Sequence, residues 1–209
     1  MARLNVNPTR MELKRLKARL ATATRGHKLL KDKSDEMIRR FTVLLKENYR
    51  LRKEVEGEIA ETLGQFSMAR SVAPLEEVEK AFSMPTARVF ADFKTSDIMS
   101  VVVPKIEVSG EAGKSGYPYA FAEITSEADY SVKKAGDTVV KILKLAEVEK
   151  SVALLALEIE RNKRRVNALE YIMIPQIEET IAYIKSKLDE NERSATTRLM
   201  KVKDMLANQ

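Results

Sequence analysis

The chain has no cysteine and no tryptophan among its 209 residues, and only 6% of its residues are aromatic. Without cysteine it can form no disulfide, offers no thiolate to a metal and has no cysteine nucleophile, which is compatible with a reducing compartment. Few aromatic side chains also leave little bulk for a large core. The composition therefore argues against a compact globule.

Long apolar runs are missing as well. No uncharged apolar stretch approaches the roughly 18 residues that a membrane span needs. The first residues also lack the apolar core of a signal peptide. We expect a soluble protein without direct insertion into a membrane.

Charge is abundant instead, at 33% of residues against about 25% in ordinary soluble domains. Together with many Leu, Ile, Ala and Met residues, this level suits long helices with much exposed surface. The net charge of +6 is uneven, because residues 1–33 hold ten Lys and Arg against two acids. Residues 64–140 are mildly acidic, with eight bases against eleven acids.

Apolar side chains recur every three or four residues along the first sixty residues. Thr9-Arg10-Met11-Glu12 has the pattern of a capping box directly after Pro8, and it predicts the helix start. Six repeats of three-four stepping predict a coiled coil. The predicted apolar seam consists of Leu13, Leu16, Leu20, Leu30, Met37, Phe41, Leu44 and Leu51. His27, Ser34 and Asn48 fall on the same seam and would fix its register.

The C-terminal part repeats this design. Its predicted seam consists of Val152, Leu155, Ile159, Val166, Leu169 and Met173, with Asn162 and Asn191 as polar members. The stepping changes near Pro175, which lacks a backbone donor, so a local bend or unwinding is expected there. Gly136-Asp137-Thr138 offers a cap for the start of this helix. Each helix would be roughly 80–100 Å long.

Two amphipathic helices joined by some seventy residues most simply pair antiparallel within one chain. The expected fold is mainly α: a long antiparallel two-helix coiled coil of residues 1–64 and 137–209. Residues 65–136 would form a small α/β insertion that contains a β-hairpin at about residues 100–125.

The stretch "GEAGKSGYPY", residues 110–119, resembles a phosphate-binding loop but fails its spacing. Such a loop needs a glycine five positions before Gly113, where this chain has Val108, and Gly-Lys-Ser should open a helix. Alternation after Tyr117 favours instead a hairpin of strands 100–108 and 117–125, with Pro104 on an edge. Lys114 and Ser115 would then be exposed at its tip, without nucleotide binding.

No group of residues in the sequence has the pattern of a catalytic site. His27 is the only histidine, and with no cysteine or second histidine beside it, a packed or partly solvated seam residue is the preferred interpretation. The sequence predicts no catalytic residue, no cofactor and no metal site.

Basic residues offer two candidate protein interfaces. The first, at the ends of the paired helices, comprises Arg3, Arg10, Lys14, Arg15, Arg198 and Lys201; the second, in the middle, comprises Arg161, Arg164 and Arg165. For the second set, a solvated face is about as plausible as an interface. A nucleic-acid role is disfavoured because the seam runs straight through the basic helix, and because residues 1–33 have no aromatic side chain. A coiled-coil scaffold or a basic nucleic-acid-binding protein stays the alternative.

Two stretches resemble the signatures of the D subunit of V-type and A-type rotary ATPases: "NPTRMELKRLKARLATATRGHKLLKDKSDEM" (Asn7 to Met37) and "NKRRVNALEYIMIPQIEETIAYI" (Asn162 to Ile184). The resemblance implies a non-catalytic rotor axle inside a hexamer of A and B subunits. It also implies a small partner in the central stalk, the F subunit, and a further rotor subunit that links to the membrane ring. The location implied is a cytoplasmic, peripheral membrane complex that couples ATP hydrolysis or synthesis to ion movement.

Overall fold

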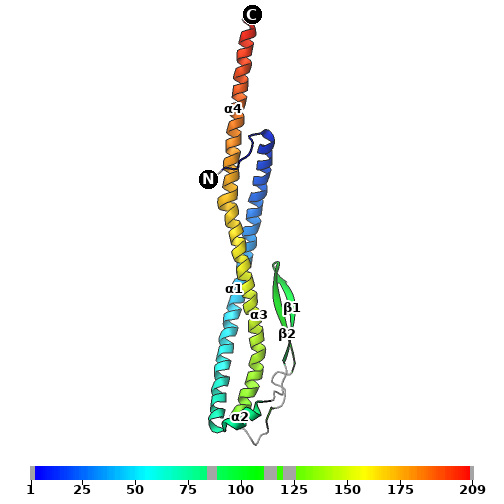
Figure 1. Cartoon of the computed structure of the whole chain (residues 1–209), viewed down its shortest axis with the longest axis vertical. Coiled ribbons are helices and arrows are strands. Elements are labelled where there is room, and N and C mark those ends of the chain that lie inside the picture. The colour runs from blue at the N-terminus through cyan, green and yellow to red at the C-terminus, as the bar shows by residue number, and fades with distance from the viewer. Residues whose placement is uncertain (1–2, 84–88, 111–116, 120–125, 208–209) are drawn as a thin grey trace. The chain divides into compact units, whose positions relative to one another are not determined.

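Helices form most of the computed structural model, which describes residues 3–83, 89–110, 117–119 and 126–207. Along the chain the elements are α1 (Arg10–Val72), α2 (Leu75–Ala81), β1 (Val89–Ile98), β2 (Val101–Gly110), α3 (Ser126–Ala168), the π-helix η1 (Leu169–Met173) and α4 (Ile174–Ala207) (Figure 1). The chain divides into two units. The first unit is residues 1–36 with 159–209, and the second is residues 37–158.

Helix α1 begins where the capping pattern predicted. The Thr9 hydroxyl accepts a hydrogen bond from the Glu12 N–H at 3.2 Å, and the Thr9 carbonyl accepts one from the Leu13 N–H at 3.0 Å. Thr9 therefore satisfies donors that would otherwise be orphaned in the first helical turn. At its other end α1 continues to Val72, beyond the predicted limit near residue 64.

In the first unit, α1 runs antiparallel to η1 and α4. Arg10 forms an ion pair with Glu192, whereas His27 lies 3.3 Å from Glu170, so the partner number falls as the α1 number rises. The core is formed by the buried Leu16, Ile177 and Ile184, with Leu4, Leu13, Leu20, Ile181 and Leu188 packed against them. An apolar seam thus joins the two helices.

The expected local unwinding near Pro175 is present as η1. The Ile174 N–H bonds to the Leu169 carbonyl five residues back, which widens this turn. Pro175 cannot donate to the carbonyl of Tyr171, and its ring would crowd it in a regular helix. The wide turn also shifts the seam. Met173, which the stepping placed on the seam, is exposed, and burial resumes at Ile177.

In the second unit, α1 pairs antiparallel with α3. Arg52 lies 3.6 Å from Glu149, and Glu61 accepts a hydrogen bond from Tyr130. Leu51 and Leu155 are buried. Helix α3 starts at Ser126, eleven residues before the predicted cap, and Thr138 is a helix-interior residue whose hydroxyl donates to the Lys134 carbonyl. The Gly136-Asp137-Thr138 cap was therefore wrong.

The hairpin is present, but its pairing differs from the prediction. Strand β2 covers the expected residues, yet it pairs antiparallel with β1, from Val89↔Gly110 to Ile98↔Val101. Of the predicted partner, residues 117–119 lie outside any strand, and residues 120–125 are outside the described residues. Met99 and Ser100 close the turn with φ of 56° and 70°. A two-residue turn with both φ positive suits the twist of paired strands.

The remaining seam residues lie on the paired faces of the helices. Every predicted apolar member except Met173 is buried or half-buried. Among the polar members, Ser34 and Asn162 are buried and Asn48 is half-buried, but Asn191 is exposed. Asn191 was misassigned because α4 has no helical partner in the described residues at this point. The fold class predicted from the sequence, long paired helices with a small hairpin-bearing insertion, is confirmed.

Candidate interaction surfaces

The predicted basic tip is rearranged by the first residues of the chain, which fold back along α4. The Leu4 N–H donates to the buried Thr180 hydroxyl at 3.2 Å, and the Arg3 guanidinium lies 4.5 Å from the centre of the Tyr183 ring. Arg3 is also 3.9 Å from Glu179. It therefore does not join Arg198 and Lys201, as simple antiparallel pairing predicted.

The other basic residues of α1 near the tip are exposed. Arg10 pairs with Glu192, and Arg15 lies 3.7 Å from Glu12 on its own helix; Lys14 is exposed beside them. Two of these basic residues thus have an acidic neighbour. The ends of the paired helices therefore carry charges of both signs rather than a uniformly basic surface.

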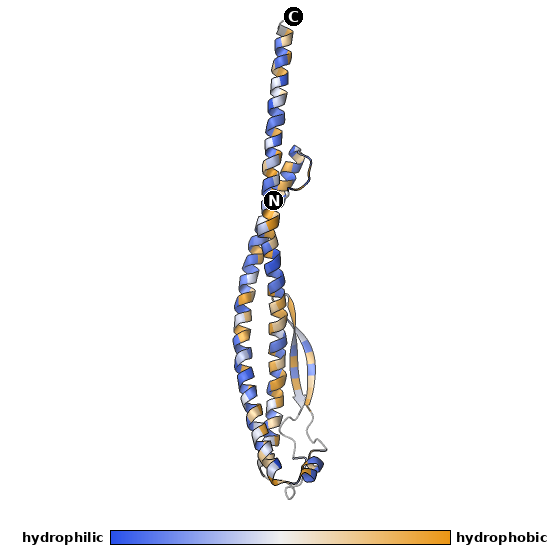
Figure 2. Ribbon diagram, turned by 60° about the vertical axis from the view of Figure 1, so that its left-hand side comes forward, coloured by the Kyte–Doolittle hydropathy of each residue, from blue (hydrophilic) through white to orange (hydrophobic). Residues whose placement is uncertain are grey.

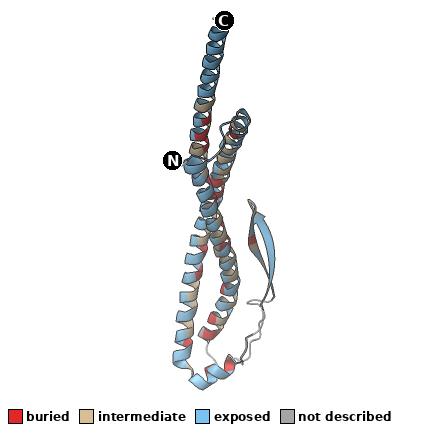
Figure 3. Ribbon diagram, turned by 45° about the horizontal axis from the view of Figure 1, so that its top comes forward, coloured by how far each residue is buried: buried red, intermediate tan, exposed pale blue. Residues whose placement is uncertain are grey.

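Helix α4 continues past the start of α1 without a helical partner in the described part of the chain. Residues 189–206 are all exposed, and they include Arg198 and Lys201 (Figure 3). Large apolar side chains are exposed between and beyond these bases: Leu199, Met200, Val202, Met205 and Leu206 are 51–70% exposed. Figure 2 shows hydrophobic and hydrophilic residues alternating along this end of α4.

These apolar residues were missed as a site, although the sequence held the signal. Leu188, Ala195, Leu199, Val202 and Leu206 continue the seam at spacings of seven, four, three and four. An apolar seam that continues beyond the end of the partner helix indicates an interaction surface for another protein. We name residues Ala195–Leu206 the bare end of α4.

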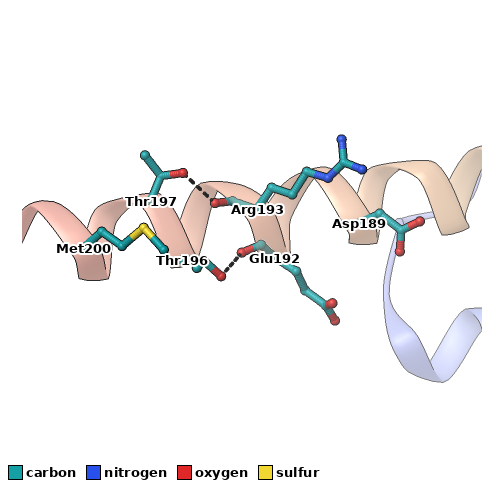
Figure 4. Close-up of a pocket in the computed structure, with 6 residues that line it drawn as sticks. All are labelled: Asp189, Glu192, Arg193, Thr196, Thr197 and Met200. Atoms are coloured by element: carbon teal, nitrogen blue, oxygen red, sulfur yellow. Dashed lines mark hydrogen bonds between the residues drawn. The ribbon is translucent and has the colours of Figure 1, made fainter.

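A shallow depression lies on α4 and extends onto the bare end (Figure 4). It is lined by Asp189, Glu192, Arg193, Thr196, Thr197 and Met200. The two threonine hydroxyls donate to carbonyls one turn back, Thr196 to Glu192 and Thr197 to Arg193. Glu192 and Arg193 extend to opposite sides of the helix in Figure 4, so their charges do not converge on one ligand. The depression is helix surface, not a chemical centre.

The mid-coil bases lie on an exposed face of α3. Arg161, Arg164 and Arg165 are exposed, and Arg164 forms an ion pair with Glu160 one turn away. The half-buried His27 lies beside Glu170, in keeping with the predicted role as a polar seam residue. In the described ranges no group of three or more His, Cys, Asp or Glu residues has metal-binding geometry.

Ion pairs flank the helix pair of the second unit. The Lys141 ammonium donates to Glu54 at 2.7 Å and also to Glu58. These hydrogen bonds raise the pKa of Lys141, and the bond from Lys141 is the largest cause of the lowered pKa of Glu54. Along the coil, hydrogen bonds from Tyr130 and then Lys134 lower the pKa of Glu61. These contacts fix the register of α1 against α3.

An aromatic cluster closes the end of this helix pair. The Phe66 and Phe82 rings meet edge to face at 5.5 Å between centroids, and Phe82 meets Tyr119 at 5.6 Å. Tyr117 stacks on Tyr119 at 5.9 Å. The Tyr119 hydroxyl donates to Asp129 at 2.7 Å; burial first, and then this bond, raise the pKa of Tyr119. Such edge and offset contacts are the favoured aromatic geometries.

The hairpin is attached to α3 through β2. The Ile106 N–H donates to the Glu147 carboxylate at 2.8 Å, and Val103 is buried. Three large apolar side chains of the hairpin stay exposed: Phe90, Phe93 and Val102. Lys114 and Ser115, predicted at the hairpin tip, fall outside the described residues. No helix among the described residues is long and apolar enough to span a membrane.

Comparison with known proteins gives a consistent family match. A family model for the D subunit of ATP synthase matches residues 12–204. The V-type ATP synthase D subunit of Thermoanaerobacter sp. (strain X514) is 52% identical over 206 residues, covering 99% of each chain. The protein of the same name from Clostridium novyi (strain NT) is 54% identical over 209 residues, covering 99% of this chain and 97% of the relative.

Proposed function

Because the chain belongs to the D-subunit family of V-type ATP synthases, we propose that it is the rotor shaft in the central stalk of such a complex. It is a non-catalytic subunit of that complex. In this role it couples ATP hydrolysis or synthesis in a hexamer of A and B subunits to ion translocation by the membrane rotor. Its location is cytoplasmic, in a peripheral assembly on the membrane.

The bare end of α4 is the observation that carries this proposal. It presents Leu199, Val202 and Leu206 among the bases Arg198 and Lys201, and no described part of the chain covers it. Large apolar side chains exposed along one helix mark a surface for a protein partner. A single helix end of this kind fits a central opening in a ring of subunits.

An asymmetric shaft gives a physical route for coupling. Three catalytic sites that are equivalent in sequence become different when one shaft touches each of them differently. A contact shifts the conformational equilibrium of a site only through its differential free energy in the two states. The exposed bases suit this task because each exposed ion pair is worth only about 0–1 kcal/mol, so no single contact becomes a deep trap.

The proposal assigns three partners. The A and B hexamer surrounds the bare end of α4 and the basic tip. The small F subunit of the central stalk binds the second unit, where the hairpin lies beside α3 (Figure 1). A further rotor subunit joins the shaft to the membrane ring.

Rotation of the chain within an immobilised hexamer tests this function. The native chain has no cysteine, so cysteines introduced at Glu76 and Glu77, both exposed on α2, give a unique attachment point for a bead. ATP should then drive unidirectional rotation of the bead. A complex that hydrolyses ATP at its normal rate while the bead stays still would show that the chain is not the rotor.

A further inference from the structure

The two edges of the β1–β2 hairpin differ in how their backbone groups are used. On the outer edge of β2, Pro104 has no N–H to offer, and the Ile106 N–H is bonded to Glu147 of α3. Proline and covering contacts are the usual ways in which proteins close a sheet edge. The β2 edge is therefore closed at Pro104 and Ile106.

The register shows which amides of β1 face outward. Because the Ile106 N–H leaves the ladder to reach Glu147, its pair with Phe93 is a non-hydrogen-bonded pair. The pair Thr95↔Pro104, two positions along, is of the same kind. The N–H groups of Phe93 and Thr95 thus point away from β2, while those of Lys94 and Ser96 point into the ladder.

Among the described residues, no backbone segment pairs with this outward row of β1. The described sheet has two strands, so no further strand among the described residues lies beyond β1. Residues 92–97 are all exposed, and Figure 3 shows β1 pale blue over most of its length. The Phe93 side chain is 74% exposed on the same face as Val102, which is 63% exposed.

We propose that the outer edge of β1 takes an extended segment of a neighbouring subunit as a third strand. Only an extended backbone satisfies a row of alternating N–H and C=O groups, and strand addition at a sheet edge is a known mode of recognition. On the face of Phe93 and Val102, the added strand would place an apolar side chain beside Phe93. On the other face it would meet Asp92 and Lys94.

We assign the edge to a neighbouring subunit because the relatives of this chain are subunits of a multisubunit complex. A second copy of the chain is the other occupant that the experiment tests: in a symmetric β1–β1 pair centred on Phe93, each Lys94 would face Asp92 of the other copy, and these opposite charges attract. Within its own hairpin, Lys94 forms a hydrogen-bonded ion pair with Glu107. The proposal rests on membership of a multisubunit complex and not on rotation, so the rotation experiment can fail without affecting it.

Amide hydrogen exchange tests the proposal, with the full-length chain measured alone and in the assembled complex. The amides of Phe93 and Thr95 should exchange about tenfold or more slowly in the complex. The amides of Lys94 and Ser96 should be protected in both samples, because they are bonded within the hairpin.

Substitutions at adjacent positions separate loss of the edge from loss of the hairpin. Thr95→Pro removes an outward N–H, as Pro104 does directly opposite, so the hairpin should persist while the protection of Phe93 in the complex is lost. Thr95→Val keeps the N–H and should behave as the native chain. Ser96→Pro removes an inward N–H and should abolish protection of Lys94 even in the isolated chain.

Two outcomes would overturn the proposal. Phe93 and Thr95 amides that exchange freely in the complete complex would show that the edge stays open. Amides already protected in the isolated chain would show that the edge is filled by the chain itself or by a second copy, which sedimentation distinguishes.

Discussion

The two units end their helix pairs in different ways. In the second unit the pair of α1 and α3 is closed by α2 and by the rings of Phe66, Phe82 and Tyr119. In the first unit α4 continues from Leu188 to Ala207 with all residues from 189 to 206 exposed. At the closed end, apolar side chains pack against other residues of the same chain. At the bare end they stay exposed, which leaves them available to a binding partner.

The units also differ in what holds their helices together. Leu16, Ile177 and Ile184 form a continuous buried cluster in the first unit. The second unit adds ion pairs with shared partners, such as Lys141 between Glu54 and Glu58. Apolar burial supplies most of the free energy of pairing, and exposed charges mainly select its register.

The largest expected effect comes from the buried cluster. Ile184 is fully buried, so Ile184→Ala should lower the free energy of unfolding by about 2–5 kcal/mol through lost burial and a cavity. Leu199→Ala, on the bare end, is the matched control and should change it by less than about 0.5 kcal/mol. Urea unfolding followed by circular dichroism measures both. Equal losses would mean that the bare end is packed in the isolated protein.

The second prediction concerns the bare end as a binding surface. Deleting residues 195–209 should leave the melting temperature nearly unchanged, but should weaken binding to the A and B hexamer by about tenfold or more, which is about 1.4 kcal/mol. Affinity is measured by titrating the labelled chain with the hexamer.

Two double substitutions then separate apolar contact from charge at this end. Leu199→Ser with Val202→Ser should reproduce most of the loss. Arg198→Ala with Lys201→Ala should mainly reduce the dependence of binding on salt. If the truncated chain binds as the native one does, with the same salt dependence, the bare end has no part in holding the shaft.

The third prediction concerns the hairpin turn. Ser100 has a φ of 70°, which costs free energy for any residue with a β-carbon. Ser100→Gly should therefore stabilise the hairpin by about 0.5–1 kcal/mol, and Ser100→Ala should not. Exchange of the amides of Lys94 and Ser96 reports this local stability. Faster exchange in the glycine variant would contradict the prediction.

That turn also explains why the hairpin pairing was mispredicted. Met99-Ser100 lacks the Asn-Gly or Asp-Gly signal of a two-residue turn. The Asp97 carboxylate supports the turn by accepting a hydrogen bond from the Ser100 N–H at 2.9 Å. Such a side-chain contact is not visible as a pattern, whereas the glycines at 110, 113 and 116 formed an obvious one and drew the predicted turn to them.

The paired helices were predictable because their signal repeats. Three-four stepping placed Leu16 and Leu155 on the seam, and the missing N–H of Pro175 predicted the irregular turn. The fold-back of Arg3 and Leu4 was not predictable, since it depends on single contacts to Thr180 and Tyr183 that have no period. Periodicity and capping patterns therefore predicted the helices. The position of the first residues against α4 depends on single long-range contacts, which such patterns do not reveal.

The smallest expected effect is that of Lys141, whose contact with Glu54 is exposed. Hydrogen bonding to Lys141 lowers the pKa of Glu54 below 4.5, so the stability that Glu54 contributes is present above that pH. This stability is lost as pH falls through the lowered folded-state pKa, because protonated Glu54 no longer forms an ion pair with the Lys141 ammonium.

Lys141→Met should therefore lower the midpoint of urea unfolding slightly at pH 7, and the difference from the native chain should shrink as Glu54 becomes protonated. Lys144→Met, at an exposed position three residues along α3, serves as the matched control and should show no such convergence. If the difference between Lys141→Met and the native chain stayed constant down to about pH 2, the effect would not come from the ion pair with Glu54.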